Sequence, residues 1–120
     1  MNSTQGQPQE LFLEELEQAV LSKTQQTPPE RILFLSVLLQ ALLDATKPET
    51  PTEPEDERVA RDQAKAWFLA SVGVTAEDFS EVCDLAGVSP KRMRTFALQV
   101  LVTKEIRFER KRINTILSFK

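Results

Sequence analysis

Apolar residues recur every three or four positions along successive stretches of the chain, which is the spacing of helices with one buried face. A first helix is predicted from about Gln9 to Ser22, with glutamates on its outer face. Its apolar positions are Leu13, Leu16, Ala19 and Val20. A second helix is predicted to begin near Thr27, whose side chain can cap it while Glu30 completes a capping box.

The second predicted helix is apolar on nearly every side. Residues 32–43 are all apolar except Ser36 and Gln40. A helix of this kind must be covered all round. Two interpretations remain open: it is the central core helix of the fold, or part of its surface packs against another copy of the chain.

A third helix is expected from about Glu57 to Val72, ended by Gly73. It follows residues 46–57, whose three prolines and five acids indicate a solvated loop or linker. The expected inner face consists of Val59, Ala60, Ala64, Trp67 and Phe68. The expected outer face consists of Arg58, Arg61, Asp62 and Lys65.

The stretch from residue 75 to residue 101 has the pattern of a helix-turn-helix. Thr75 is expected to cap a short helix, and Gly87 supplies the left-handed residue of the turn that ends it. Ser89 can cap the next helix, with Pro90 in its first position. The expected buried residues are Phe79, Val82, Cys83 and Ala86 on the first helix and Met93, Phe96, Ala97, Val100 and Leu101 on the second.

These patterns predict an all-α fold, a helical bundle of about five helices that includes a helix-turn-helix and carries an acidic, proline-rich loop. The scarcity of glycine and the absence of tyrosine also favour helices over a sheet. The predicted segments are a flexible arm (1–8), a helical pair that is a candidate for oligomerisation (9–45), an acidic proline-rich linker (46–57), a part containing the helix-turn-helix (58–103) and a basic C-terminal extension (104–120).

Charge is distributed unevenly along the chain. Residues 1–87 contain 6 Lys/Arg and 16 Asp/Glu, whereas residues 88–120 contain 9 Lys/Arg and 2 Asp/Glu. A basic segment of this kind is suited to a polyanion such as double-stranded DNA. A helix pair with a glycine turn also occurs in proteins that never contact DNA, and a basic face can simply be solvated.

The cations lie where a helix-turn-helix protein contacts DNA, at the start of the second helix and downstream of it. Arg and Lys can bond guanine edges or phosphates, and Gln can read adenine. The candidate DNA-binding residues are Lys91, Arg92, Arg94, Thr95, Gln99, Lys104, Arg107, Arg110, Lys111 and Arg112. The segment from residue 104 onward is either an arm that grips phosphates or a docking peptide for a partner protein.

Several classes of chemistry have no support in the sequence. Cys83 is the only cysteine and there is no histidine, which excludes the usual zinc sites and the Ser-His and Cys-His nucleophile pairs. The three glycines form no phosphate loop. We therefore expect no enzyme activity, no metal and no cofactor. No apolar run is long enough to cross a membrane and no signal peptide is evident, so a cytoplasmic location is expected.

A short pattern resembles phage-encoded proteins, namely the small terminase subunits of tailed phages and of related gene transfer agents of alphaproteobacteria. The pattern comprises residues 66–68, the run Asp78 to Pro90 and Met93-Arg94, with similarity in placement upstream from Ile32 to Ala45. The turn Leu85 to Ser89 also resembles that of many bacterial and phage DNA-binding proteins. The resemblance covers roughly residues 30–97.

The resemblance implies a non-catalytic subunit that forms rings, binds DNA for packaging and delivers it to the large terminase subunit. Many small terminases place the DNA-binding part first, whereas here the candidate oligomerising helix comes first. This difference leaves open which surface faces DNA. Two other functions fit the sequence: a dimeric transcription regulator using the same helix, and an adaptor whose basic C-terminal tail binds an acidic protein.

Overall fold

Six α-helices and no strand make up the part of the chain that the computed structural model describes, residues 8–22 and 29–118, with side chains described for 12–20 and 29–118. The helices are α1 (Pro8–Ser22), α2 (Pro29–Ala45), α3 (Glu55–Leu69), α4 (Val74–Ala86), α5 (Pro90–Leu101) and α6 (Arg110–Ser118). The all-α class is therefore confirmed. The predicted arm at 1–8 and the predicted cap at Thr27 lie almost wholly outside the described residues.

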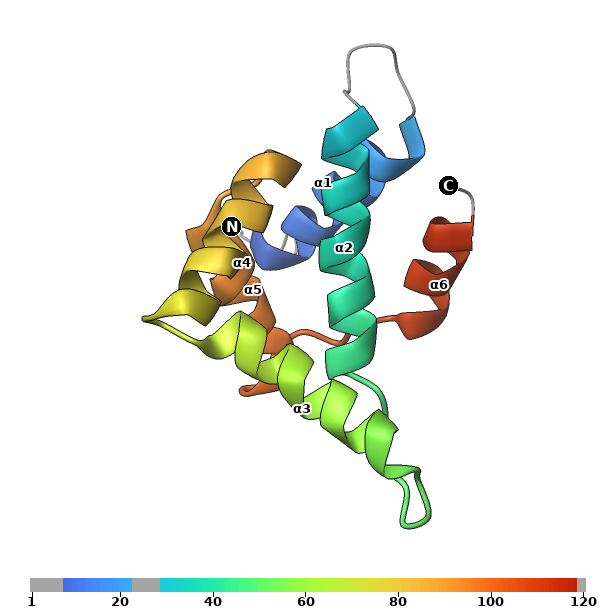
Figure 1. Ribbon diagram of the computed structural model, residues 1–120. Helices are drawn as coiled ribbons and strands as arrows, with labels where there is room; N and C mark the ends of the chain where they lie inside the picture. The colour runs from blue at the N-terminus through green and yellow to red at the C-terminus, as the bar shows by residue number, and fades with distance from the viewer. Residues whose placement is uncertain (1–7, 23–28, 119–120) are drawn as a thin grey trace.

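Helix α2 is the centre of the fold. It packs against α1, α3, α4 and α6, and Figure 1 shows α4 and α5 on one side of it and α6 on the other. Its buried leucines form the middle of one continuous core. Leu33 and Val37 nevertheless remain 56 % and 39 % exposed, so one strip of α2 has no cover from the described residues.

Aromatic side chains join α3 to α4 and α5 to α1. Phe68 and Phe79 are fully buried, and their ring centroids lie 5.9 Å apart in an edge-to-face arrangement that is favourable for aromatic pairs. Trp67 packs edge-on against both rings, while its indole nitrogen donates to Asp78 at 2.7 Å. On the far side of α5, Phe96 contacts Phe12 of α1. These contacts make the helix-turn-helix part of one core.

The buried face of α3 differs from the predicted one. Arg61, expected on the outer face, is only 3 % exposed, whereas Val59, expected inside, is 37 % exposed. The reason lies in the preceding loop, where the Glu53 carboxylate accepts two hydrogen bonds from the Arg61 guanidinium at 2.7 and 2.8 Å. Burial of an arginine is possible when its charge is paired in this way.

The junction between α3 and α4 also differs from the prediction. Helix α3 ends at Leu69 rather than at Gly73, and Gly73 instead lies at the N-cap of α4 with a φ of 92°. Thr75, expected to cap α4, lies within its first turn. A glycine is suited to this position because a residue with a side chain rarely adopts a positive φ.

The C-terminal segment does not continue α5. Helix α5 ends at Leu101, and a connector of residues 102–109 leads to α6, which packs on α2 and α1 through its buried residues Ile113 and Ile116. In the folded chain, the first residues of this basic segment lie beside α3, and its last residues, in α6, lie beside α1.

Candidate nucleic-acid interface

The turn between α4 and α5 has the geometry that the sequence predicts. Gly87 adopts the left-handed conformation, with φ 77° and ψ 26°, and its N–H donates to Asp84 O at 3.0 Å. Ser89 caps α5 by accepting a hydrogen bond from the backbone N–H of Arg92, and Pro90 follows in the first turn. A Cβ at Gly87 would lie 2.5 Å from Nε of Arg31, so the turn needs glycine for two reasons.

Arg92 folds back on α1. Its guanidinium donates to both carboxylate oxygens of Glu15 at 3.2 and 3.4 Å and lies 4.5 Å from the centroid of the Phe12 ring. The side chains of Arg92 and Glu15 are 46 % and 60 % exposed. An exposed pair of this kind contributes at most about 1 kcal/mol. A phosphate can therefore compete with Glu15 for Arg92.

Arg94 of α5 turns toward the end of α3. Its Nη2 donates to the backbone oxygen of Ala70 at 2.7 Å, beyond the end of α3, and its guanidinium lies 5.6 Å from the centroid of the Phe79 ring. The side chain is half-buried. Arg94 therefore does not project outward with Lys91 and Arg92, because it donates to the carbonyl of Ala70, just past the end of α3.

The exposed stripe of α5 carries little positive charge. It consists of Lys91, Thr95, Leu98 and Val102, with Leu98 and Val102 40 % and 54 % exposed. The Thr95 hydroxyl donates to the backbone oxygen of Lys91, and the Gln99 side chain donates to Glu105 at 3.1 Å. Of the five predicted contacts on this helix, Lys91 is the one with an exposed side chain and no partner among the described residues.

The predicted cations of α6 differ in their availability. Arg110 donates to the backbone oxygen of Leu43 and to the Thr46 hydroxyl, which fixes α6 against the end of α2. Arg112 pairs with Glu17 of α1, whereas Lys111 is exposed. Burial raises the pKa of Glu17, and the charge and hydrogen bond of Arg112 oppose that rise.

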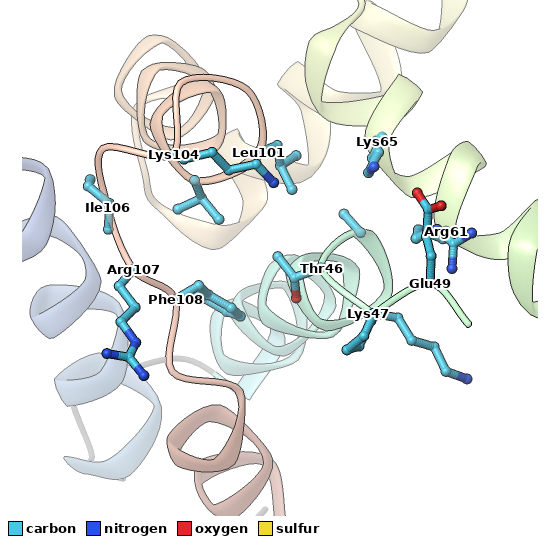
Figure 2. A pocket seen from close by; sticks show the side chains of 13 residues that line it. Thr46, Lys47, Glu49, Arg61, Lys65, Leu101, Lys104, Ile106, Arg107 and Phe108 are labelled. Carbon is cyan, nitrogen blue, oxygen red and sulfur yellow. The ribbon is translucent and has the colours of Figure 1, made fainter. Parts of the chain in front are cut away.

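Lys104 and Arg107 lie in the connector. The fold places them near other cations, which come from the part of the chain that has an excess of acids. Together they line a cavity of about 480 Å³ between α3, the α2–α3 loop and the connector. We call it the basic pocket. Its charged residues, most of them visible in Figure 2, are Lys47, Glu49, Arg61, Lys65, Lys104 and Arg107.

Sequence reasoning missed three members of the basic pocket, Lys47, Arg61 and Lys65. They belong to the stretch with an excess of acids, and no local spacing links them to Lys104. Only the packing of α3 against α5 brings the two groups together.

Comparisons of the chain with protein families, with curated proteins and with solved structures gave no match. Among the described residues, no helix has the length and apolar character needed to cross a membrane. The same residues contain no group of three or more His, Cys, Asp or Glu side chains placed to hold a metal ion.

Proposed function

We propose that the chain is a non-catalytic DNA-binding subunit that holds duplex DNA by its phosphate backbone. One observation carries the proposal. Lys91, Lys104, Arg107 and Lys111 are exposed and have no ion-pair partner among the described residues. Backbone binding needs cations that are free to replace the counterions of DNA. Arg92 would join them when a phosphate displaces Glu15.

The orientation of the complex follows from the turn. The start of α5, where Lys91 is exposed next to the Ser89 cap, is placed to meet a phosphate at the edge of the groove. The exposed stripe beyond it is poor in base-reading side chains. We therefore infer that binding depends on backbone contacts more than on base sequence.

We further propose the role of a small terminase subunit, which delivers DNA to the large subunit as an oligomer. Support comes from the short pattern shared with such proteins and from the exposed side chains of Leu33 and Val37 on α2, which suit a contact between copies. The mass of the 13.6 kDa chain in solution tests this role. A ring of about eight or more copies supports it, whereas a monomer contradicts it.

DNA binding itself is tested by anisotropy of a labelled duplex at low salt. The double variant Lys91→Gln/Lys111→Gln should bind about tenfold more weakly than the wild type, because two phosphate contacts are lost. Arg58→Gln is the control, since Arg58 is an exposed cation of α3 that already pairs with Glu55 and Asp62. Equal affinity of the double variant and the wild type would refute the proposal.

An adaptor that binds an acidic protein is a second candidate, favoured by Leu98 and Val102. Their exposure beside Lys91 gives α5 a mixed apolar and cationic stripe that suits a protein surface. Leu98→Ser tests whether the apolar stripe takes part in DNA binding. DNA affinity should be unchanged in this variant, and a loss comparable to that of Lys91→Gln/Lys111→Gln would place the stripe in the DNA contact and count against the adaptor.

A further inference from the structure

We propose that the basic pocket is a binding site for one phosphate group of a nucleotide, either a free mononucleotide or a nucleotide within a DNA strand. The pocket is separate from the start of α5. It shares only Lys104 and Arg107 with the cations proposed above to hold DNA.

The charge in the pocket is strongly positive. Five cations line it and one carboxylate, Glu49, does. Lys47 pairs with Glu57 at 2.9 Å and Arg61 pairs with Glu53. Lys65 and Lys104 have no ion-pair partner among the described residues. Two unpaired ammonium groups at one cavity favour a bound anion.

Lys65 and Lys104 line the same cavity from two different segments of the chain. Figure 2 shows the Lys104 ammonium directed across the pocket toward the side formed by α3, where Lys65 lies. Arg107 and Lys47 lie at other edges and point away from the centre. The Glu49 carboxylate lies on the side of Lys65 and Arg61, where it lowers the attraction for an anion. Lys65 and Lys104 are thus the residues expected to contact the phosphate.

Arg61 forms part of the wall of the pocket. It is held rigidly by its two hydrogen bonds to Glu53, and its Nε is buried without an acceptor among the described residues. Hydrogen bonds to Glu53 raise its pKa, so the guanidinium stays charged. Because Glu53 pairs with Arg61, this guanidinium is a rigid wall of the pocket, and the charge available to an anion comes from Lys65 and Lys104.

The backbone at Lys104 is strained. Its φ is 61°, and it is the one residue other than glycine with a positive φ among the described residues. This conformation costs a residue with a side chain about 1 kcal/mol or more. Strain of this kind is typical of binding sites. In this protein the strained residue is Lys104, whose ammonium extends across the pocket.

The rest of the pocket sets the class of ligand. Its apolar lining comes from Val100, Leu101, Ile106 and Phe108. A volume of about 480 Å³ exceeds what a phosphate ion needs and suits a ligand with a planar or apolar part. A nucleotide has both a phosphate for the lysines and a base for the apolar wall.

The test is an NMR titration of the ¹⁵N-labelled chain with inorganic phosphate and with deoxyadenosine 5′-monophosphate. We expect saturable shifts at amides that line the pocket, with the nucleotide binding more tightly than phosphate. Affinity should fall about tenfold in Lys65→Gln and in Lys104→Gln and should rise in Glu49→Gln. It should be unchanged in the control Arg58→Gln, which removes the same charge from an exposed residue of α3 outside the pocket lining.

The inference is overturned if the shifts do not saturate, or if Lys65→Gln, Lys104→Gln and the control Arg58→Gln lose affinity equally. Glu49→Gln guards against misfolding, because it is expected to gain affinity and an unfolded chain cannot. If a DNA duplex displaces the mononucleotide, the phosphate that the pocket binds belongs to a DNA strand. If the duplex does not displace it, the ligand is a free nucleotide. If the wild type binds no DNA but still binds the nucleotide in the pocket, the proposed function is refuted and the pocket inference stands. If the wild type binds DNA but no nucleotide in the pocket, only the pocket inference is refuted.

Discussion

The guanidinium of Arg92 lies against the carboxylate of Glu15, with nitrogen–oxygen distances of 3.2 and 3.4 Å. The pair joins α1 to the start of α5, the part of a helix-turn-helix that enters DNA. A second pair, Glu17 with Arg112, joins the same helix to α6. Helix α1 therefore places acids on two of the arginines that the sequence assigns to DNA.

Glu15→Gln should strengthen DNA binding. The variant frees Arg92 from a competing carboxylate, and because an exposed pair contributes at most about 1 kcal/mol, the gain should be up to about fivefold. Glu14→Gln is the matched control, since Glu14 is an exposed acid on the same helix without an ion pair among the described residues. Anisotropy of a labelled duplex measures both. An equal gain in the two variants would mean that net charge alone is responsible.

Arg94→Ala should destabilise the fold, whereas Arg92→Ala should not. Arg94 donates to the Ala70 carbonyl and packs on Phe79, and loss of a hydrogen bond from a charged group costs about 1.5–3 kcal/mol. Arg92 makes only its exposed pair with Glu15 and a contact with Phe12, so its removal should cost under about 1 kcal/mol. Urea unfolding compares the two. Equal free energies of unfolding would contradict the inward role of Arg94.

Two carboxylates should give the stability of the fold opposite dependences on pH. The pKa of Glu53 is lowered by its hydrogen bonds from Arg61, so the stability that it contributes is present above its ordinary pKa of 4.5 and is lost as the pH falls through the lowered value. The pKa of Glu17 is raised by burial. Its protonated form favours the folded state, and that contribution is lost as the pH rises through the raised value.

Unfolding free energies measured between about pH 2 and pH 7 test this expectation. Relative to the wild type, Glu53→Gln should flatten the fall in stability at low pH, and Glu17→Gln should remove a loss of stability as the pH rises. Changes of the same sign in both variants would contradict the assigned environments of the two groups.

Lys104→Gly should move stability and anion binding in opposite directions. Glycine adopts a φ of 61° without the steric penalty of a side chain, so the free energy of unfolding should rise by about 0.5–1 kcal/mol. The lost ammonium should weaken nucleotide binding in the basic pocket. Thermal melts and the nucleotide titration measure the two effects. A fall in stability would show that the Lys104 side chain supports the fold and that its backbone is not strained.

The features that the sequence predicted correctly depend on local chemistry. Gly87, Ser89 and Pro90 specify a turn and a helix start through their own backbone and side-chain preferences, and the structure has both where they were expected. Periodicity placed Met93 and Phe96 correctly in the core for the same reason. These signals lie within a few residues of the structure that they determine.

The features that it did not predict depend on partners distant in the sequence or in the fold. Arg61 is buried because Glu53 reaches it from the loop, and Arg94 turns inward because α3 ends beside it. The basic pocket needs Lys65 of α3 and Lys104 of the connector to meet. Helical periodicity contains no information on contacts between residues that are distant in the sequence. The positive charge of the C-terminal third could therefore be predicted, but the arrangement of its side chains could not.

The dependence of DNA affinity on salt tests most directly whether exposed, unpaired cations hold the phosphate backbone. Four contacts, from Lys91, Lys104, Arg107 and Lys111, predict a loss of about 10²-fold in affinity for any duplex sequence between 50 and 200 mM salt. Each lysine or arginine replaced by glutamine should lower the slope of log affinity against log salt by about 1. An affinity that is insensitive to salt, or a slope unchanged in the variant lacking all four cations, would contradict the account.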